Sequence, residues 1–380
     1  MATITKSIGT DSRDYSTFRT WADDLDEAAL YADDDTAVGE MYNDDVHELS
    51  GLFYFADQGT NIGGTGAELT EARLTVPAGE RHDGTAGTGM RIDQVGATGG
   101  RIEISYGGDH IRHSVEWCEV NAGGSGEVFI IGNFGGDWLW HGKIDHLLCH
   151  NYEFTTTAPI VTFNSRSGEL TNSIFYDITS SNSTRLRVIQ CGSYYTLIAN
   201  NTIFGATNSA TASAEVYGIH VDVNAGSQGN TMVCYNNIVV GTNSTGSGAT
   251  VADFYFNGSM QTQSNNLSSD TSAASTSGGG SGDDAVTGVS ASNLFVSTVG
   301  GCEDLHLKAG ADAIGGAKDL GTGYAMEGQS YGSYGTTLNM DIDNYNRNDD
   351  DAWDIGAAQR VSAAPAGSTQ PIILVSNTTL

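Results

Sequence analysis

The sequence predicts an all-β fold: a single-stranded right-handed parallel β-helix with an N-terminal capping helix and an irregular C-terminal cap. Three observations lead to it. The 380-residue chain has 50 glycines but only 4 prolines, a composition typical of many short strands joined by tight turns. Similar short segments return roughly every thirty residues through the middle of the chain. A second set of apolar runs returns in step with them.

The first repeated column is an apolar residue with an asparagine two positions before it. The apolar positions are Ile174, Ile203, Ile238 and Leu267, at intervals of 29, 35 and 29 residues. Their asparagines are Asn172, Asn201, Asn236 and Asn265. Two less exact members, Cys118 and Leu148, come earlier and carry Glu116 and His146 in the asparagine position. Because stacked asparagines can hydrogen-bond from one rung to the next, we expect a structural asparagine ladder.

The second column shows that two strands advance together in each period. Its members are Ile130, Val161, Val188, Ile219 and Phe254, at intervals of 31, 27, 31 and 35 residues. Hairpin proteins place turn signals about every 8 to 12 residues, whereas here a similar strand returns only after a full coil. Like strands would therefore stack in parallel, about 4.8 Å apart, and several rungs must stack to bury their inner faces.

Four regions are predicted along the chain. They are an N-terminal lead-in and capping segment (1–44), the parallel β-helix (45–300), closing coils and a cap (301–360), and a C-terminal tail (361–380). In the first region, residues 15–31 are predicted to form a capping helix that begins at Ser16 or Thr17. The predicted buried stripe of this helix is Phe18, Trp21, Leu25 and Leu30. Segments 45–56, 70–78 and 88–106 are predicted as strands of the first rungs.

Charge and cysteine usage exclude several function classes. Sixteen basic residues against 46 acidic ones give a net charge of −30, which repels nucleic acid and anionic membranes.

The N-terminus lacks the pattern of a secretory signal, and no stretch is apolar enough for a membrane span, so neither export by that route nor membrane insertion is expected. The five cysteines are far apart without a CxxC pair, and we expect buried free thiols.

Both ends of the chain resemble a known fold family. The run Asp304–Gly315, with Asp341-Ile342-Asp343 and Asp354-Ile355-Gly356-Ala357, resembles the closing coils of parallel β-helix repeat proteins. The N-terminal Ile8-Gly9-Thr10 and Asp14-Tyr15-Ser16-Thr17 resemble the start of pectate-lyase-like folds, including many phage and environmental proteins. The pattern departs from that family at Asp312 and Gly315-Gly316, which alters a turn. The resemblance implies the fold and leaves the function open, because this fold carries lyases, hydrolases, adhesins and virion proteins.

Two groups of residues are candidates for chemistry. Polysaccharide-cleaving enzymes with a similar fold use paired carboxylates or a base beside a cation. The best candidate group for such chemistry in this sequence combines residues from two stacked rungs. Its members are Asp109, His110, His113, Asp145, His146 and His150, which would share one lateral patch if strands 110–118 and 144–150 stack. His146 also fits the asparagine column as a structural residue. No cofactor is required by the sequence, but Asp341, Asp343 and Asp349 offer hard oxygen ligands for calcium.

The function expected is non-enzymatic: a virion structural or surface protein, such as a phage decoration, fibre or tail-associated rod made in the host cytoplasm. A start directly in the fold, a C-terminal tail suited to contacts between subunits and the lack of a familiar active-site motif favour it. The expected partners are other copies of the chain, for example in a homotrimer, other virion proteins and host surface polysaccharide. Aromatic residues that could supply such contacts are Phe134, Trp138, Trp140, Tyr194 and Tyr195. The alternatives are a polysaccharide lyase or glycoside hydrolase and a glycan-binding adhesin, either of which would be extracellular.

Overall fold

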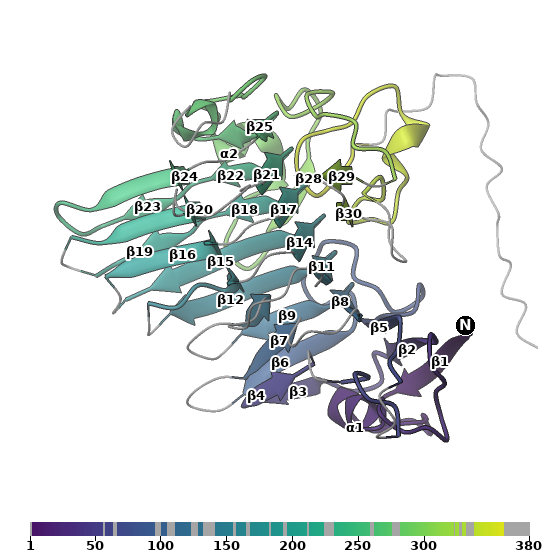
Figure 1. Cartoon of the computed structure of the whole chain (residues 1–380). Helices are drawn as coiled ribbons and strands as arrows, with labels where there is room; N and C mark the ends of the chain where they lie inside the picture. Colours follow the sequence, from purple (N-terminus) through teal and green to yellow (C-terminus); the bar gives the residue numbers. More distant parts are fainter. Residues whose placement is uncertain are drawn as a thin grey trace, which may run out of the picture.

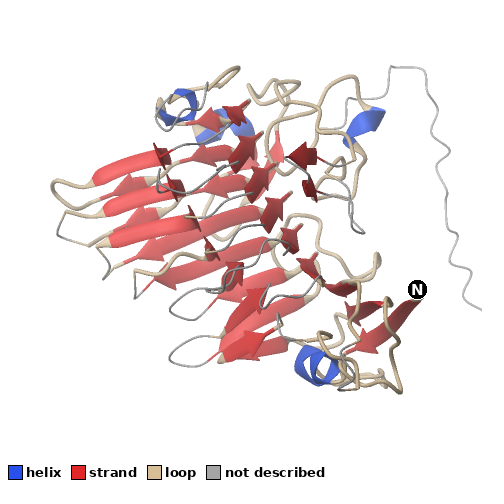
Figure 2. Ribbon diagram, in the orientation of Figure 1, coloured by secondary structure: helices blue, strands red, loops and turns tan. Residues whose placement is uncertain are grey.

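Short parallel strands, repeated in the same order along the chain, make up most of the protein (Figures 1 and 2). The computed structural model describes residues 2–55, 58–63, 67–95, 100–104, 111–122, 128–131, 141–154, 157–164, 168–181, 184–192, 196–210, 213–223, 232–258, 262–275, 282–322, 324–326, 329–331 and 338–360. Helices within these ranges are short: α1 (Phe18–Asp23), α2 (Ala291–Leu294) and the 3-10 turns Ser272–Ala274 and Arg347–Asp349. None of the described helices has the length and apolar character needed to span a membrane.

The strands form three long sheets. Sheet 1 contains, in spatial order, β1 (Thr3–Ile8), β2 (Thr36–Met41), β5 (Glu71–Thr75), β8 (Arg112–Glu116), β11 (His141–Asp145), β14 (Gly168–Thr171), β17 (Thr196–Ala199), β21 (Met232–Tyr235) and β25 (Thr262–Ser264). Sheet 2 contains β3 (His47–Ser50), β6 (Arg91–Val95), β9 (Glu119–Ala122), β12 (Leu148–Phe154), β15 (Ile174–Ser180), β18 (Thr202–Phe204), β22 (Ile238–Val240) and β26 (Leu267–Ser268), with β19 (Thr207–Asn208) and β23 (Asn243–Ser244) beside this path. Sheet 3 contains β4 (Leu52–Tyr54), β7 (Arg101–Ile104), β10 (Phe129–Ile131), β13 (Val161–Phe163), β16 (Arg185–Cys191), β20 (Glu215–Val223) and β24 (Thr250–Gly258).

The chain visits the three sheets in turn, one coil after another. From β5 onward the order is sheet 1, sheet 2, sheet 3 and back to sheet 1, and each strand pairs in parallel with its counterparts in the neighbouring coils. This arrangement is consistent with a parallel β-helix and confirms the prediction of an all-β fold with stacked parallel strands. The parallel pairing already includes β1 and β2, which lie in the predicted lead-in segment.

The interior of the coils is filled by vertical files of apolar side chains. In sheet 1, Val115, Ile144, Leu170, Ile198 and Cys234 occupy the same register position and belong to one buried cluster. Because alternate residues of a strand point to opposite faces, the residues between them point outward. Four of the five cysteines are buried free thiols, as predicted, and Cys302 is exposed.

The predicted columns are displaced by one residue at several rungs. Ile174 pairs with Thr202 and, through it, with Ile238, so the prediction that Ile203 belongs to this column is wrong. Ile203 lies instead in the inward file between Phe175 and Val239. The same displacement applies at Cys118, where Glu119 is the partner of Leu148, and in sheet 3, where Phe129 and Ile189 replace Ile130 and Val188. In sheet 3, β10 is apolar on both faces, so neither face marks its register. In sheet 2, the residues in register at these rungs are the polar Thr202 and Glu119, which do not fit a column defined by apolar residues.

The N-terminal helix is shorter than predicted. Thr17 is its N-cap and accepts a hydrogen bond from the Thr20 backbone, while Phe18 and Trp21 are buried. The helix ends at Asp23 rather than continuing to Tyr31. Four acids between positions 23 and 27 explain the early end, because negative charge at a helix C-terminus opposes the helix dipole.

The described residues between 311 and 360, here called the C-terminal strap, run along the side of the coils (Figure 1). Strap residues cover outward apolar side chains of sheet 2 such as Ile174 and Ile238, and of sheet 1 such as Leu197 and Val233. Just before the strap, β27 (Phe295–Ser297) pairs antiparallel with β28 (Asp304–Leu307), and within it β29 (Tyr324–Met326) pairs antiparallel with β30 (Gln329–Tyr331). The segment predicted as closing coils therefore contributes antiparallel pairs in its described part. The predicted tail, 361–380, lies outside the described residues.

Candidate functional site

The turn after each strand of sheet 1 from β8 to β25 places one residue in a left-handed backbone conformation. We call this column the turn file, and its members, with φ between 50° and 63°, are Trp117, His146, Asn172, Asn200, Asn236 and Asn265. Asparagine tolerates this conformation better than most residues because its short polar side chain can bond locally. His146 therefore lies in the column where the sequence predicted it, whereas Trp117 takes the position predicted for Glu116.

The asparagines form two neighbouring ladders. In the turn file, Asn200 Nδ2 donates to Asn172 Oδ1 (3.1 Å) and Asn236 Nδ2 donates to Asn200 Oδ1 (2.9 Å). Asn172, Asn236 and Asn265 belong to this file, but Asn201, predicted there, does not, since Asn200 occupies that rung. The Asn-Asn pair at 200–201 allowed either residue to fit the sequence pattern, and the misaligned Ile203 selected the wrong one.

Asn201 belongs to an inner ladder one position further along the chain. Its backbone N–H donates to Asn237 Oδ1 (3.1 Å), and the backbone N–H of Asn237 donates to Asn266 Oδ1 (3.0 Å). The side-chain amides of Asn201 and Asn237 donate to the carbonyls of Leu170 and Ile198. These bonds satisfy the backbone groups that a tight bend leaves buried and unpaired.

The turn file also holds the C-terminal strap. Side-chain nitrogens of His146, Asn200, Asn236 and Asn265 lie at hydrogen-bond distance from four strap carbonyls, those of Asp341 (2.8 Å), Leu338 (3.1 Å), Lys318 (2.8 Å) and Gly316 (2.9 Å). Along the file, the partner's position in the strap increases from Gly316 to Asp341 as the rung descends from Asn265 to His146. The strap thus runs down the coils, bound mainly through its backbone.

A buried charged cluster lies on the outward face of sheet 1. Lys143 Nζ is 3.1 Å from Asp145 Oδ2 and 3.8 Å from Glu116 Oε1, and all three side chains are at most 2% exposed. Asp145 Oδ1 also accepts from Thr171 Oγ1 and Asn172 Nδ2 and lies 2.8 Å from His146 Nδ1. Burial raises the pKa of Glu116, and Lys143 opposes that rise. The cluster is built as a paired and hydrogen-bonded network, which buried charges require.

The four candidate catalytic residues that the structure describes lie in three separate places. Asp145 and His146 adjoin each other but are sealed, and the imidazole of His146 stacks on Trp117 with ring centroids 3.7 Å apart. His113 is buried against Phe55, its Nε2 is 2.9 Å from the Gln58 carbonyl, and burial lowers its pKa to about 4.

His150 lies on sheet 2, where its Nε2 is 2.9 Å from Glu119 Oε1 and its ring stacks on Tyr176. Asp109 and His110 lie outside the described residues, as do the aromatic positions Phe134, Trp138, Trp140, Tyr194 and Tyr195. The expected lateral patch is therefore not assembled by the four members that are described, because they occupy different faces and different sheets.

The three calcium candidates have separate partners. Asp341 is buried, and its carboxylate accepts from the backbone N–H groups of Asp343, Tyr345 and Gln359. Asp343 Oδ1 lies 2.9 Å from His306 Nε2, and Asp349 Oδ1 accepts from Asn346. The described residues contain no group of three or more His, Cys, Asp or Glu side chains that could hold a metal. This arrangement does not fit a site in which the three carboxylates share one ion, and calcium stays a prediction.

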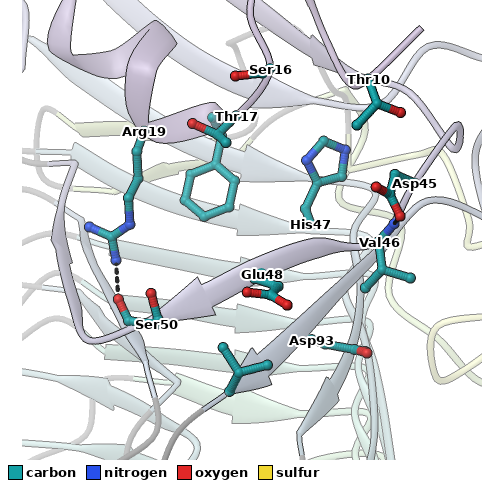
Figure 3. A pocket seen from close by; sticks show the side chains of 12 residues that line it. Thr10, Ser16, Thr17, Arg19, Asp45, Val46, His47, Glu48, Ser50 and Asp93 are labelled. Carbon is teal, nitrogen blue, oxygen red and sulfur yellow. Dashed lines mark hydrogen bonds between the residues drawn. The ribbon is translucent and has the colours of Figure 1, made fainter.

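A pocket that the sequence does not predict lies at the N-terminal end of sheet 2. This pocket, of about 620 Å³, lies between the start of α1 and the outward face of β3 and β6. Figure 3 shows Glu48 and Asp93 on these adjacent strands and Arg19 hydrogen-bonded to Ser50. Strands 45–56 and 88–106 were predicted, but their register and the packing of α1 beside them are tertiary features with no local signal.

Comparison with known proteins gives no further guide to the site: no family model, no curated protein and no solved structure matches the chain. The resemblance to pectate-lyase-like proteins therefore stays a prediction, and the function has to be argued from the chain's own geometry.

Proposed function

We propose that this chain is a non-enzymatic structural rod, a virion surface or tail-associated protein folded as a single-stranded right-handed β-helix of the pectate-lyase-like superfamily, with α1 as its N-terminal cap. The observation that carries the non-enzymatic proposal is the burial of Asp145 and His146, at 1% and 0% exposed. These two residues are the only described pair among the candidate catalytic residues in contact with each other, and a substrate cannot reach groups that the fold seals.

Two further observations support a structural role. The stacked coils provide a continuous core along the sheets, which suits a stiff element rather than a mobile one. The strap covers the outward apolar faces of sheets 1 and 2, so the side of the rod is closed by the chain itself. Assembly into a homo-oligomer such as a trimer, with other virion proteins as neighbours, belongs to the same proposal.

The proposal is tested first by activity. The purified full chain, incubated with a panel of neutral and acidic polysaccharides, should release neither new reducing ends nor unsaturated products. Cleavage that is lost in Asp145→Asn or His146→Ala would overturn the non-enzymatic assignment.

The virion placement is tested separately. An antibody raised against the chain should label particles purified from a culture that makes it, and sedimentation equilibrium of the pure protein should show a defined homo-oligomer. A chain found only in the particle-free fraction would contradict the virion placement and leave the rod architecture unaffected.

A further inference from the structure

The pocket at the N-terminal end of sheet 2 is an open site that the proposed rod function does not use. Its floor is the outward face of β3 and β6, where Glu48 pairs in register with Asp93. The two carboxylates therefore belong to adjacent rungs, about 4.8 Å apart along the rod. Glu48 is exposed and makes no hydrogen bond or ion pair with a described residue, so its carboxylate is available to a ligand.

Carboxylates outnumber cations in the described lining of the pocket, where Asp45, Glu48 and Asp93 accompany one guanidinium. Arg19 is the only arginine or lysine among the described residues that line it. Its guanidinium donates to the backbone carbonyls of Ser50, Gly51 and Leu52, so it is held against the backbone while it keeps its positive charge. Burial lowers the pKa of His47, against the opposing effect of its contact with the Tyr42 carbonyl, so this side chain is neutral near pH 7. Arg91, which does not line the pocket, pairs with Asp93 (Nε to Oδ1, 2.8 Å). An anionic ligand would still meet the carboxylates of Asp45 and Glu48 against the single charge of Arg19, which disfavours its binding.

Apolar and polar groups share the lining. Val46 is 38% exposed at the rim, and Val95 lies next to Ser50 in register on the floor. Ser16 and Ser50 add hydroxyl groups, which can both donate and accept. A ligand that fits must therefore present many O–H donors, an apolar C–H face and no negative charge.

From this lining we propose that the pocket binds an uncharged saccharide, with Glu48 and Asp93 accepting hydrogen bonds from sugar hydroxyls and Val46 and Val95 contacting the C–H face of a ring. Hydrogen bonds to a carboxylate are stronger than those to a neutral acceptor, so Glu48 provides the largest single contribution. This inference adds a binding site to the proposed rod and requires neither cleavage nor placement in a virion.

The test uses the full chain on an array of neutral, acidic and basic oligosaccharides, followed by calorimetric titration of the best neutral ligand. We expect binding to neutral oligosaccharides and none to uronate oligomers. Glu48→Gln should weaken binding about tenfold, the loss of one charged hydrogen bond. Glu27→Gln removes the same charge from an exposed position that does not line the pocket, and it should bind as the unaltered chain does.

Three outcomes would overturn the site: no neutral ligand on the array, equal or stronger binding of uronate oligomers, or binding only to basic oligosaccharides that disappears with added salt. Binding that is unchanged in both Glu48→Gln and Asp93→Asn would also place the saccharide elsewhere. None of these outcomes depends on cleavage, so failure of the binding site and failure of the non-enzymatic rod remain distinguishable.

Discussion

The coils and the C-terminal strap are held together in different ways. In the coils, each strand is bound to its counterparts above and below in the same register, as Ile144 is aligned with Val115 and Leu170. The strap is held by side chains of the turn file and by single contacts such as those of the buried Arg347. The stability of the coils is distributed over many equivalent hydrogen bonds and apolar contacts. Each contact of the strap, in contrast, occurs only once. The strap should therefore detach before the coils unfold.

The largest effect is expected in the coils, at Lys143. Lys143→Met removes the nearest cation from the buried Asp145 and Glu116 and leaves only the weaker attraction of Arg73 for Glu116. This should cost about 3 kcal/mol of unfolding free energy, at the lower end for a broken buried pair. Denaturant unfolding followed by circular dichroism measures it. Adding Glu116→Gln and Asp145→Asn to Lys143→Met should recover most of the loss, and a loss that persists in the triple variant would contradict the electrostatic explanation.

The corresponding change in the strap is Arg347→Ala. The Arg347 guanidinium is fully buried and donates to the carbonyls of Asp354 (3.1 Å), Gly356 (2.8 Å) and Ala357 (2.7 Å). Its removal should cost about 2–3 kcal/mol and open the strap to limited proteolysis while the coils stay protected. Arg185→Ala is the control, because the Arg185 side chain is 51% exposed and its ion pair with Glu215 contributes little. Simultaneous loss of coil and strap would mean that the two regions unfold as one unit.

Asn236 contacts both regions, because it bonds to Asn200 in the coils and to Lys318 in the strap. Asn236→Ala removes the bonds to Asn200 and Lys318 and places alanine at φ 57°, for an expected loss of about 2 kcal/mol. Asn236→Gly removes the same amide but tolerates the backbone, so it should be less destabilising. Thermal unfolding of both variants separates backbone strain from hydrogen bonding. Equal losses would assign the whole effect to the amide.

The smallest effect is expected from pH at His306. Hydrogen bonding to Asp343 raises the pKa of His306 to about 9, against the opposing effect of burial and with help from Asp304, while Asp83 adds a further nearby charge. Because the folded pKa exceeds the ordinary value of about 6.5, the contribution is fully present below about pH 6.5 and is lost as pH rises through about 9. The stability difference between the unaltered chain and His306→Gln should be about 1 kcal/mol at pH 6 and smaller at pH 10. A difference that does not change with pH would rule out an ionic origin.

Much of the coil architecture could be read from the sequence, but its register could not. The period was visible because Ile174, Ile238 and Leu267 do share one register position. Asn201 was assigned to the wrong ladder because the residue that shares the register position of Ile174 is the polar Thr202, so the apolar Ile203 beside it fitted the column instead. The outward apolar residues are buried by the strap, and no local sequence pattern predicts that the strap packs there.

The candidate sites show the same division. Sequence periodicity placed His146 in a structural column, and that position is in the turn file. Whether His146 would be open to a substrate depended on distant segments, because its Nε2 lies against the Asp341 carbonyl and its own carbonyl lies against His82 Nε2. The pocket beside Glu48 depends on the placement of α1 against sheet 2, and neither segment carries a pattern of its own that indicates a site.

By itself the sequence determined the class of the fold, its period of about thirty residues and the asparagine-rich turns, because stacked coils repeat the same local requirements in every rung. The tertiary structure alone decided which face of each strand is covered, where the strap runs and which carboxylates stay accessible. These features arise from contacts between distant segments. Each such contact occurs only once, so it produces no repeating pattern in the sequence.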